Sequence, residues 1–205
     1  MKKTFFHGRC CSGFTLVESL VVLLIILLLS AGSFTAFQQI TQSSGLVSGS
    51  QMVMDQFDLA RQTAITRNRS VEVQIFQLPS ETFPEKKVYR ALRLGVIDEH
   101  GTNYLSKVQF FPQGIAVQEE PEESPLVMAH EVQGGETTLP SFGKIFYKQF
   151  RFRPNGSTDL KIFNQEGWYL LLRLEKDSDE KASQKIFCIQ IDPATGRSRS
   201  LRPKD

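Results

Sequence analysis

The chain has 205 residues, 40% of them hydrophobic, which is enough for one modest globular core and too little for two full domains. Its formal net charge is +2, but Lys2, Lys3 and Arg9 lie among the first thirteen residues. Without those three, the 24 basic residues fall to 21 against 22 acidic ones, a net charge of about −1. Bulk charge therefore favours no class of partner, and any basic binding site has to be local.

The cysteines predict no stabilising disulfide. Cys10 and Cys11 precede a long apolar run, and Cys188 lies far from both. If the N-terminal residues are removed, one cysteine remains, and it has no intrachain partner. The apolar run around Cys188 favours a small buried core residue.

The first thirteen residues (MKKTFFHGRCCSG) form a short basic segment that ends in Gly13, directly before an apolar stretch. An ordinary secretory signal has the opposite order, with its small-residue cleavage site after the apolar stretch. Cleavage before the stretch would keep it in the mature protein.

Residues 14–37 predict a transmembrane helix. No charged residue occurs between Ser19 and Met54, and at 1.5 Å per residue this segment is long enough to cross about 30 Å of hydrocarbon. The basic residues before it would stay on the cytoplasmic side, which places the rest of the chain outside the inner membrane. We therefore expect a single-pass membrane protein before any assembly.

Glu18 is the exception in this apolar segment. An ionised carboxylate costs about 2.5 to 3.5 kcal/mol at the centre of a bilayer, and less near its edge. Cleavage between Gly13 and Phe14 would create a free amine four residues away, and a helix N-terminus itself favours negative charge. In an assembled bundle, Glu18 can also neutralise the amine of a neighbouring subunit.

Residues 13–18 (GFTLVE) resemble the prepilin peptidase site of type IV pilins and type II secretion pseudopilins. The resemblance implies that Gly13 ends the leader, that Phe14 becomes the N-methylated first residue, and that Glu18 serves in subunit docking. It also implies three partners: a prepilin peptidase, other pilin or pseudopilin subunits, and the inner membrane. The alternative is a plain signal anchor that carries a glutamate by chance.

Apolar residues recur at mostly helical steps beyond the membrane segment, so residues 38–68 are predicted to continue the helix as an amphipathic stretch. Gly45 and Gly49 are expected to bend it or melt one turn. The period changes near Asn68, where the helix should end.

Residues 69–205 predict a β-rich head, because short alternating runs follow one another between turn signals. The expected strands are residues 71–76, 89–97, 107–111, 144–153, 168–174 and 186–191, and the clearest turns are residues 154–157 and 192–196. Two charged segments, residues 119–125 and 177–183, indicate exposed loops. The fold class is therefore α+β, with a long N-terminal helix packed on an antiparallel β-rich head.

Two further segments carry a second resemblance. Residues 59–71 (LARQTAITRNRSV) resemble the helix-to-strand junction of the GspH/FimT branch of pilin-like proteins, and residues 152–157 (FRPNGS) are similar to its Phe-x-Pro-x-Gly turn. Residues 80–145 depart from that branch and are enlarged. The layout also resembles pilin-like proteins of the Verru_Chthon cassette type.

Catalytic chemistry is not indicated. His7, His100 and His130 are scattered and have no metal-ligand spacing, and no nucleophile elbow, P-loop or metalloprotease motif occurs. We expect no enzyme activity, no metal and no cofactor.

The C-terminus is a second basic segment, with Arg197, Arg199, Arg202 and Lys204 among the last nine residues. Alternation along a strand would put Arg197 and Arg199 on one face, where two guanidiniums can contact successive phosphates. The Gly-Arg-x-Arg spacing from Gly196 resembles that of FimT-type DNA-uptake pilins. The alternative is an edge strand with solvated arginines.

Two functions follow. The first is a structural or priming minor pilin or pseudopilin of a type IV pilus or type II secretion-like filament. The second is a minor pilin that binds double-stranded DNA through the basic tail, without sequence preference and with strong salt dependence.

Overall fold

The computed structural model describes residues 15–119, 124–162, 167–175 and 186–201, with the backbone alone for residues 30–43. The chain divides into two compact units, Met1–Thr41 and Gln42–Asp205. The second unit holds both sheets and the last 26 residues of the long helix.

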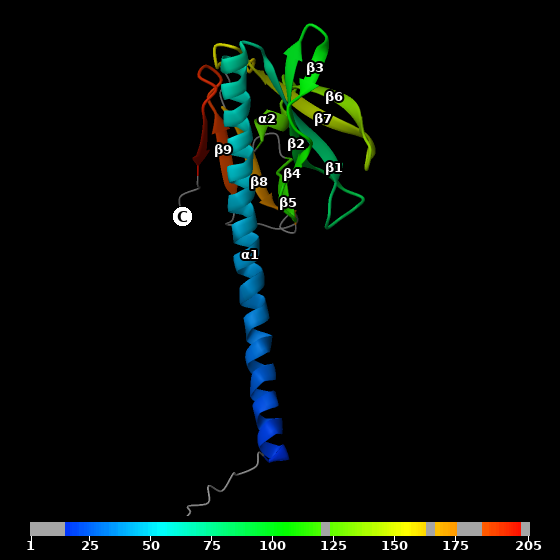
Figure 1. Ribbon diagram of the computed structural model, residues 1–205, viewed down its shortest axis with the longest axis vertical. Helices are drawn as coiled ribbons and strands as arrows, with labels where there is room; N and C mark the ends of the chain where they lie inside the picture. Colours follow the sequence, from blue (N-terminus) through cyan, green and yellow to red (C-terminus); the bar gives the residue numbers. More distant parts are fainter. Residues whose placement is uncertain (1–14, 120–123, 163–166, 176–185, 202–205) are drawn as a thin grey trace, which may run out of the picture. The chain divides into compact units, whose positions relative to one another are not determined.

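Helix α1 spans Leu16–Arg67 (Figure 1). It ends because Asn68 adopts a left-handed conformation with φ of 49°, which asparagine tolerates better than most residues. The Arg69 N–H then donates to the Ala64 carbonyl at 3.2 Å and closes the last turn. The predicted helix end near Asn68 is confirmed.

The helix is unbroken at Gly45 and Gly49, so the expected melted turn was wrong. A side chain at Gly49 would bring Cβ within 3.1 Å of the Pro112 ring. The small residue therefore permits close packing of the helix on the loop before Ile115, and the buried contacts compensate for the low helix propensity of glycine.

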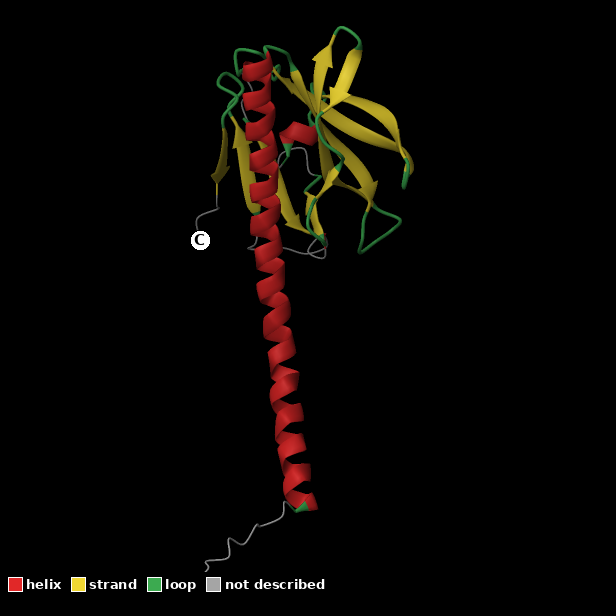
Figure 2. Ribbon diagram, in the orientation of Figure 1, coloured by secondary structure: helices red, strands yellow, loops and turns green. Residues whose placement is uncertain are grey.

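Ten strands form two antiparallel sheets in the described part of the chain (Figures 1 and 2). One sheet has six strands in the order β3-β2-β1-β7-β6, with β4 also paired to β2; the other has the order β10-β9-β8-β5. The elements are β1 (Val71–Pro79), β2 (Lys87–Asp98), β3 (Gly101–Tyr104), β4 (Gln109–Phe110), β5 (Ile115–Val117), α2 (Pro125–Met128), β6 (Gln133–Leu139), β7 (Gly143–Phe152), β8 (Trp168–Leu174), β9 (Phe187–Ile191) and β10 (Ser198–Leu201).

All six expected strands occur, and β8 has the predicted bounds. The sequence reasoning missed β3, β5 and β6 and the short helix α2. The α+β class, with a helix packed on an antiparallel β-rich region, is confirmed.

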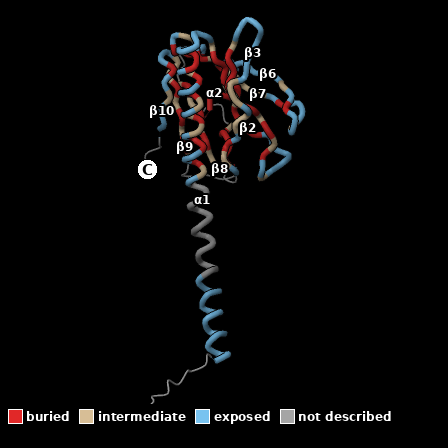
Figure 3. Tube along the Cα trace, in the orientation of Figure 1, coloured by how far each residue is buried: buried red, intermediate tan, exposed pale blue. Residues whose placement is uncertain are grey.

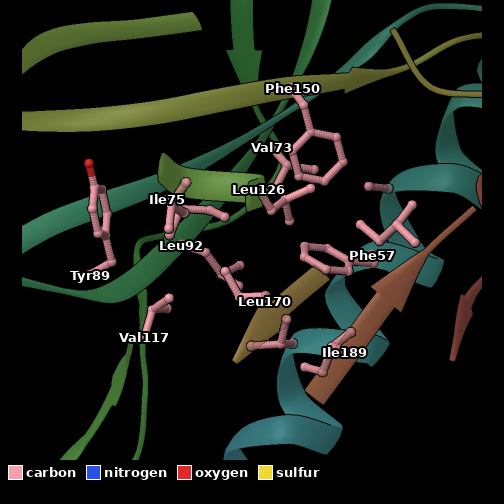
Figure 4. Packing of buried hydrophobic residues seen from close by; sticks show 14 of the residues in the cluster. Phe57, Val73, Ile75, Tyr89, Leu92, Val117, Leu126, Phe150, Leu170 and Ile189 are labelled. Carbon is pink, nitrogen blue, oxygen red and sulfur yellow. The ribbon is translucent and has the colours of Figure 1, made fainter. Parts of the chain in front are cut away.

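One core joins the second half of α1 to the inner faces of both sheets (Figures 3 and 4). Phe57 of the helix is fully buried and meets Phe150 of β7 edge to face, with ring centroids 5.5 Å apart. Leu170 of β8 and Ile189 of β9 close the core from the four-stranded sheet. Every second residue of β8 and β9 is buried, because successive side chains of a strand point to opposite faces of its sheet.

Two local expectations were wrong. Ser124 and Pro125, predicted to lie in an exposed loop, are buried, because Pro125 begins α2 and the Ser124 hydroxyl accepts a hydrogen bond from the Leu171 N–H at 3.1 Å. Cys188 is half-buried on the face of β9 opposite the core, since the strand alternation turns Ile189 inward instead. Residues 120–123 and 177–183 lie outside the described residues.

Candidate functional site

The apolar first part of α1 begins with a cap. Thr15 precedes the first helical residue, and its Oγ1 accepts a hydrogen bond from the Glu18 N–H at 3.3 Å, while its carbonyl accepts from the Ser19 N–H at 3.1 Å. A threonine followed three residues later by glutamate is the pattern of a capping box. Glu18 is thus the acidic residue of the first turn, where the helix dipole favours a carboxylate. Gly13 and Phe14 lie outside the described residues.

The helix surface beyond the cap is apolar and exposed. The side chains of residues 16–29 are all exposed, and they are leucine, isoleucine and valine except for Glu18 and Ser19 (Figure 3). A contiguous exposed apolar surface of this kind marks an interaction with a partner or with lipid. Glu18 is its one acidic group.

The described residues contain no helix that is long and apolar enough to cross a membrane.

The residues of the second resemblance meet in space. Arg61 of α1 donates from Nε to the Thr195 carbonyl at 2.8 Å, across 134 positions of sequence. A side chain built at Gly156 would lie 3.3 Å from the same guanidinium, and one built at Gly196 would lie 2.1 Å from the Gly156 carbonyl oxygen. The helix and the two turns therefore form one junction, in which a side chain at Gly196 would clash with backbone and one at Gly156 would press on Arg61 and Ile65.

Each turn of this junction holds its own shape. The Gly156 N–H donates to the Arg153 carbonyl at 2.8 Å, and the Gly196 N–H donates to the Asp192 carbonyl at 2.7 Å. Hydrogen bonds from the Thr195 hydroxyl and the Ala194 N–H hold the pKa of the Asp192 carboxyl below its ordinary value, and the charge of Arg199 adds to this. Both predicted turns are confirmed.

Arg197 and Arg199, which we call the arginine site, follow directly after the junction. Arg197 and Arg199 are both exposed, but β10 begins only at Ser198, so Arg197 precedes the strand. The Asp192 N–H donates to the Arg197 carbonyl at 3.0 Å, and the placement of both arginines on one face stays a prediction. Strand β10 is the edge of its sheet, and the Ser198 hydroxyl faces α1, 3.2 Å from Asp58 Oδ1. Arg202 and Lys204 lie outside the described residues.

Ligand and metal sites are sparse in this head. A hollow of about 150 Å³ opens beside Phe150 and Trp168, with Gln133, Gln149 and Asp159 among its polar groups. It is small beside the 300 to 1,000 Å³ of common ligand sites. Within the described residues, no group of three or more histidines, cysteines and acids could hold a metal ion. The absence of enzyme activity stays a prediction.

Residues 8–34 match the family described as the prokaryotic N-terminal methylation motif. The match contains Gly13, Phe14 and Glu18, so the segment singled out by sequence is the segment that carries the motif. This motif indicates a type IV pilin-like or pseudopilin protein that a prepilin peptidase processes and that assembles with other pilin subunits. No curated protein and no solved structure matches the chain.

The sequence reasoning did not identify Arg61 or Asp58 as functional neighbours of the basic tail. Both lie on α1, on the part of the helix that faces the four-stranded sheet. The signal was present in part, because residues 59–71 carry the second resemblance and Gly196 begins the Gly-Arg-x-Arg spacing, but the sequence alone does not show that these segments are in contact.

Proposed function

We propose that the chain is a structural or priming minor pilin or pseudopilin of a type IV pilus or type II secretion-like filament, in the GspH/FimT branch. The observation that carries the proposal is the methylation motif at residues 8–34 leading into a capped helix with Glu18 in its first turn. The junction of Arg61, Gly156 and Gly196 supports the branch, because the residues of that resemblance hold one another in place.

In this proposal residues 14–37 span the inner membrane before assembly, the leader stays cytoplasmic, and the head lies on the other side. The exposed apolar residues 16–29 support it, since such a surface needs lipid or neighbouring helices to cover it. During assembly the surface passes from lipid to the helices of other subunits. Glu18 then pairs with the free amine of a neighbouring Phe14, which offsets the cost of holding a carboxylate in an apolar bundle.

The test of this role is filament incorporation. Glu18→Ala, expressed in cells that form the filament, should be processed normally and yet be lost from the sheared filament fraction by about tenfold or more. Glu136→Ala is the matched control, because that carboxylate is exposed on β6 and pairs with the surface residue Lys144. Equal incorporation of Glu18→Ala and wild type would refute the role given to Glu18.

A second candidate, a DNA-binding minor pilin, rests on the exposure of Arg197 and Arg199. Neither guanidinium forms a salt bridge with another described residue, and Arg199 lies on the edge strand β10 while Arg197 directly precedes it. Two free arginines beside a rigid junction can contact duplex phosphates with little ordering cost.

DNA binding is testable through its salt dependence. The double variant Arg197→Gln and Arg199→Gln should make the slope of log K against log salt shallower by about 2, one unit for each lost phosphate contact. The double variant Lys87→Gln and Lys107→Gln removes two other exposed cations and is the control. An unchanged slope in the arginine variant would show that Arg197 and Arg199 do not contact DNA phosphates and are solvated side chains at the edge of the sheet.

A further inference from the structure

The six-stranded sheet has a second face, turned away from α1, which no helix covers among the described residues. Strand alternation puts Val73 and Ile75 in the main core and their neighbours Glu72 and Gln74 on this second face. The strand register sets two rows across it. One row joins Gln133, Gln149, Gln74 and Arg93, and the next joins Arg151, Glu72, Gly95 and Tyr104.

Two tyrosine rings lie flat on this face because glycines stand beneath them. A side chain at Gly95 would come within 3.3 Å of the Tyr104 ring, and one at Gly135 would come within 2.7 Å of the Tyr147 hydroxyl. Any larger residue would lift the rings from the backbone. Tyr104 keeps 46% of its surface exposed, whereas Tyr147 is half-buried and packs edge to face on Phe76, so Tyr104 offers the larger contact area to a ligand.

Planar polar groups fill the space between the rings. The Arg93 guanidinium stacks on Tyr104, 3.4 Å from the ring centroid, and its Nη2 donates to Gln74 Oε1 at 2.9 Å. Gln74 in turn donates a hydrogen bond from Nε2 to Glu72 Oε1 at 2.6 Å. Gln74 is itself buried, so the polar groups that reach the surface of this face are the partly exposed Arg93, Gln149 and Arg151.

Glu72 accepts hydrogen bonds from both Gln74 and Arg151 and so links the two rows of the face. Only 4% of the residue is exposed, and Arg151 reaches its Oε2 from both Nε and Nη2 at 3.3 Å. A carboxylate so buried needs these donors, because an unpaired charge there would cost several kcal/mol. The arrangement is a preorganised polar surface, since the cations are held by the sheet itself.

The two rings come from different strands of the face. Tyr104 leans on β2 and Tyr147 leans on β6. This arrangement favours a ligand that contacts both rings, such as a short chain of sugar rings.

The charge of the face decides between chemical classes. The ionised groups are Arg93, Arg151 and Glu72, and the carboxylate is already paired with Arg151. One uncompensated cation is too few for a polyphosphate, whose binding depends on many Lys and Arg contacts. Flat aromatic rings that alternate with planar donors and acceptors instead suit a pyranose, whose C–H face stacks on a ring while its hydroxyls bond to amides and guanidinium groups.

We propose that this face of the six-stranded sheet binds a neutral polysaccharide chain, with Tyr104 and Tyr147 as stacking platforms and Arg93, Gln149 and Arg151 as hydrogen-bonding groups. The inference goes beyond the pilin role and does not depend on it. A head that reaches the outside of the cell on a filament would meet such chains on surfaces there.

Affinity electrophoresis tests the proposal on the full chain in mild detergent. Gels cast with dextran, a soluble starch or galactomannan are compared with a gel without polysaccharide. At least one should retard the wild type, Tyr104→Ala should weaken that binding about tenfold, and Tyr104→Phe should keep it within about threefold because the ring remains. Phe83→Ala is the matched control, an aromatic residue of similar exposure in the turn between β1 and β2.

Folding is checked in parallel through the fluorescence of Trp168, the single tryptophan, so that lost binding is separated from lost structure. Gel shifts with single-stranded DNA give the competing outcome. The proposal is overturned if none of the three polysaccharides retards the chain, if Tyr104→Ala behaves like Phe83→Ala, or if the face binds DNA and no polysaccharide.

Discussion

Replacing Gly196 by alanine isolates the geometry of the junction between α1 and the two turns. The position has φ of +62°, and an added Cβ would lie 2.1 Å from the Gly156 carbonyl oxygen and 3.2 Å from the Phe152 ring. Cβ atoms do not approach backbone oxygen below about 3.0 Å, so one turn has to move. The Arg61 hydrogen bond to the Thr195 carbonyl lies next to the displaced position and should weaken with it.

The expected loss of unfolding free energy in Gly196→Ala has two parts. Left-handed backbone costs alanine about 1 to 2 kcal/mol relative to glycine, and overpacking against a fixed backbone atom adds about 1 to 3 kcal/mol. Gly114→Ala is the matched control, because that residue has φ of +73° and nothing within 4 Å of the added Cβ. Gly114→Ala is therefore expected to show only the cost of the left-handed backbone and no overpacking.

Urea unfolding of the full chain in mild detergent, followed by the fluorescence of buried Trp168, measures both variants. We expect Gly196→Ala to lose about 2 to 5 kcal/mol of unfolding free energy and Gly114→Ala about 1 to 2 kcal/mol. Equal losses would show that the turns yield without cost, and would refute the argument that the junction holds Arg197 in place.

Three other perturbations are predicted. Phe57→Ala should cost about 3 to 5 kcal/mol of unfolding free energy in the same assay, because it removes a fully buried ring from its contact with Phe150. Burial raises the pKa of Tyr89 from 10.0 to about 12, so the unfolded chain releases this proton at lower pH than the folded chain does. The free energy of unfolding should therefore fall by about 2 kcal/mol between pH 10 and 12. Tyr89→Phe should remove that part of the fall, and a variant with the pH profile of the wild type would contradict this assignment. Asn68→Val should destabilise the end of α1 by about 1 to 2 kcal/mol, whereas Asn68→Gly should be neutral or slightly stabilising, as checked by thermal melting.

The parts of the fold that the sequence predicted are those with local signals. Strand β8 is a short run of aromatic and apolar residues, and the helix end coincides with a residue that tolerates positive φ. Strand β6 was missed because its sequence, QGGETTL, has two glycines and one large apolar residue. It forms because the rings of Phe146 and Tyr147 on β7 cover those glycines, a cross-strand effect that no window of sequence contains.

The candidate sites divide in the same way. Gly13, Phe14 and Glu18 are adjacent in sequence, and a short motif suffices to single them out. The junction beside the arginine site joins residues that are up to 134 positions apart, and the second face of the six-stranded sheet depends on the register of five strands. Only the folded chain brings those groups together.

The central claim is that this chain is a pilin-like protein processed before its apolar helix. Mass spectrometry of the N-terminus after coexpression with a prepilin peptidase tests it most directly, with Gly13→Ala as the comparison. We predict a mature wild-type chain that starts at methylated Phe14, and an uncut Gly13→Ala chain. An intact Met1 in the wild type, or a cut elsewhere, would contradict the account.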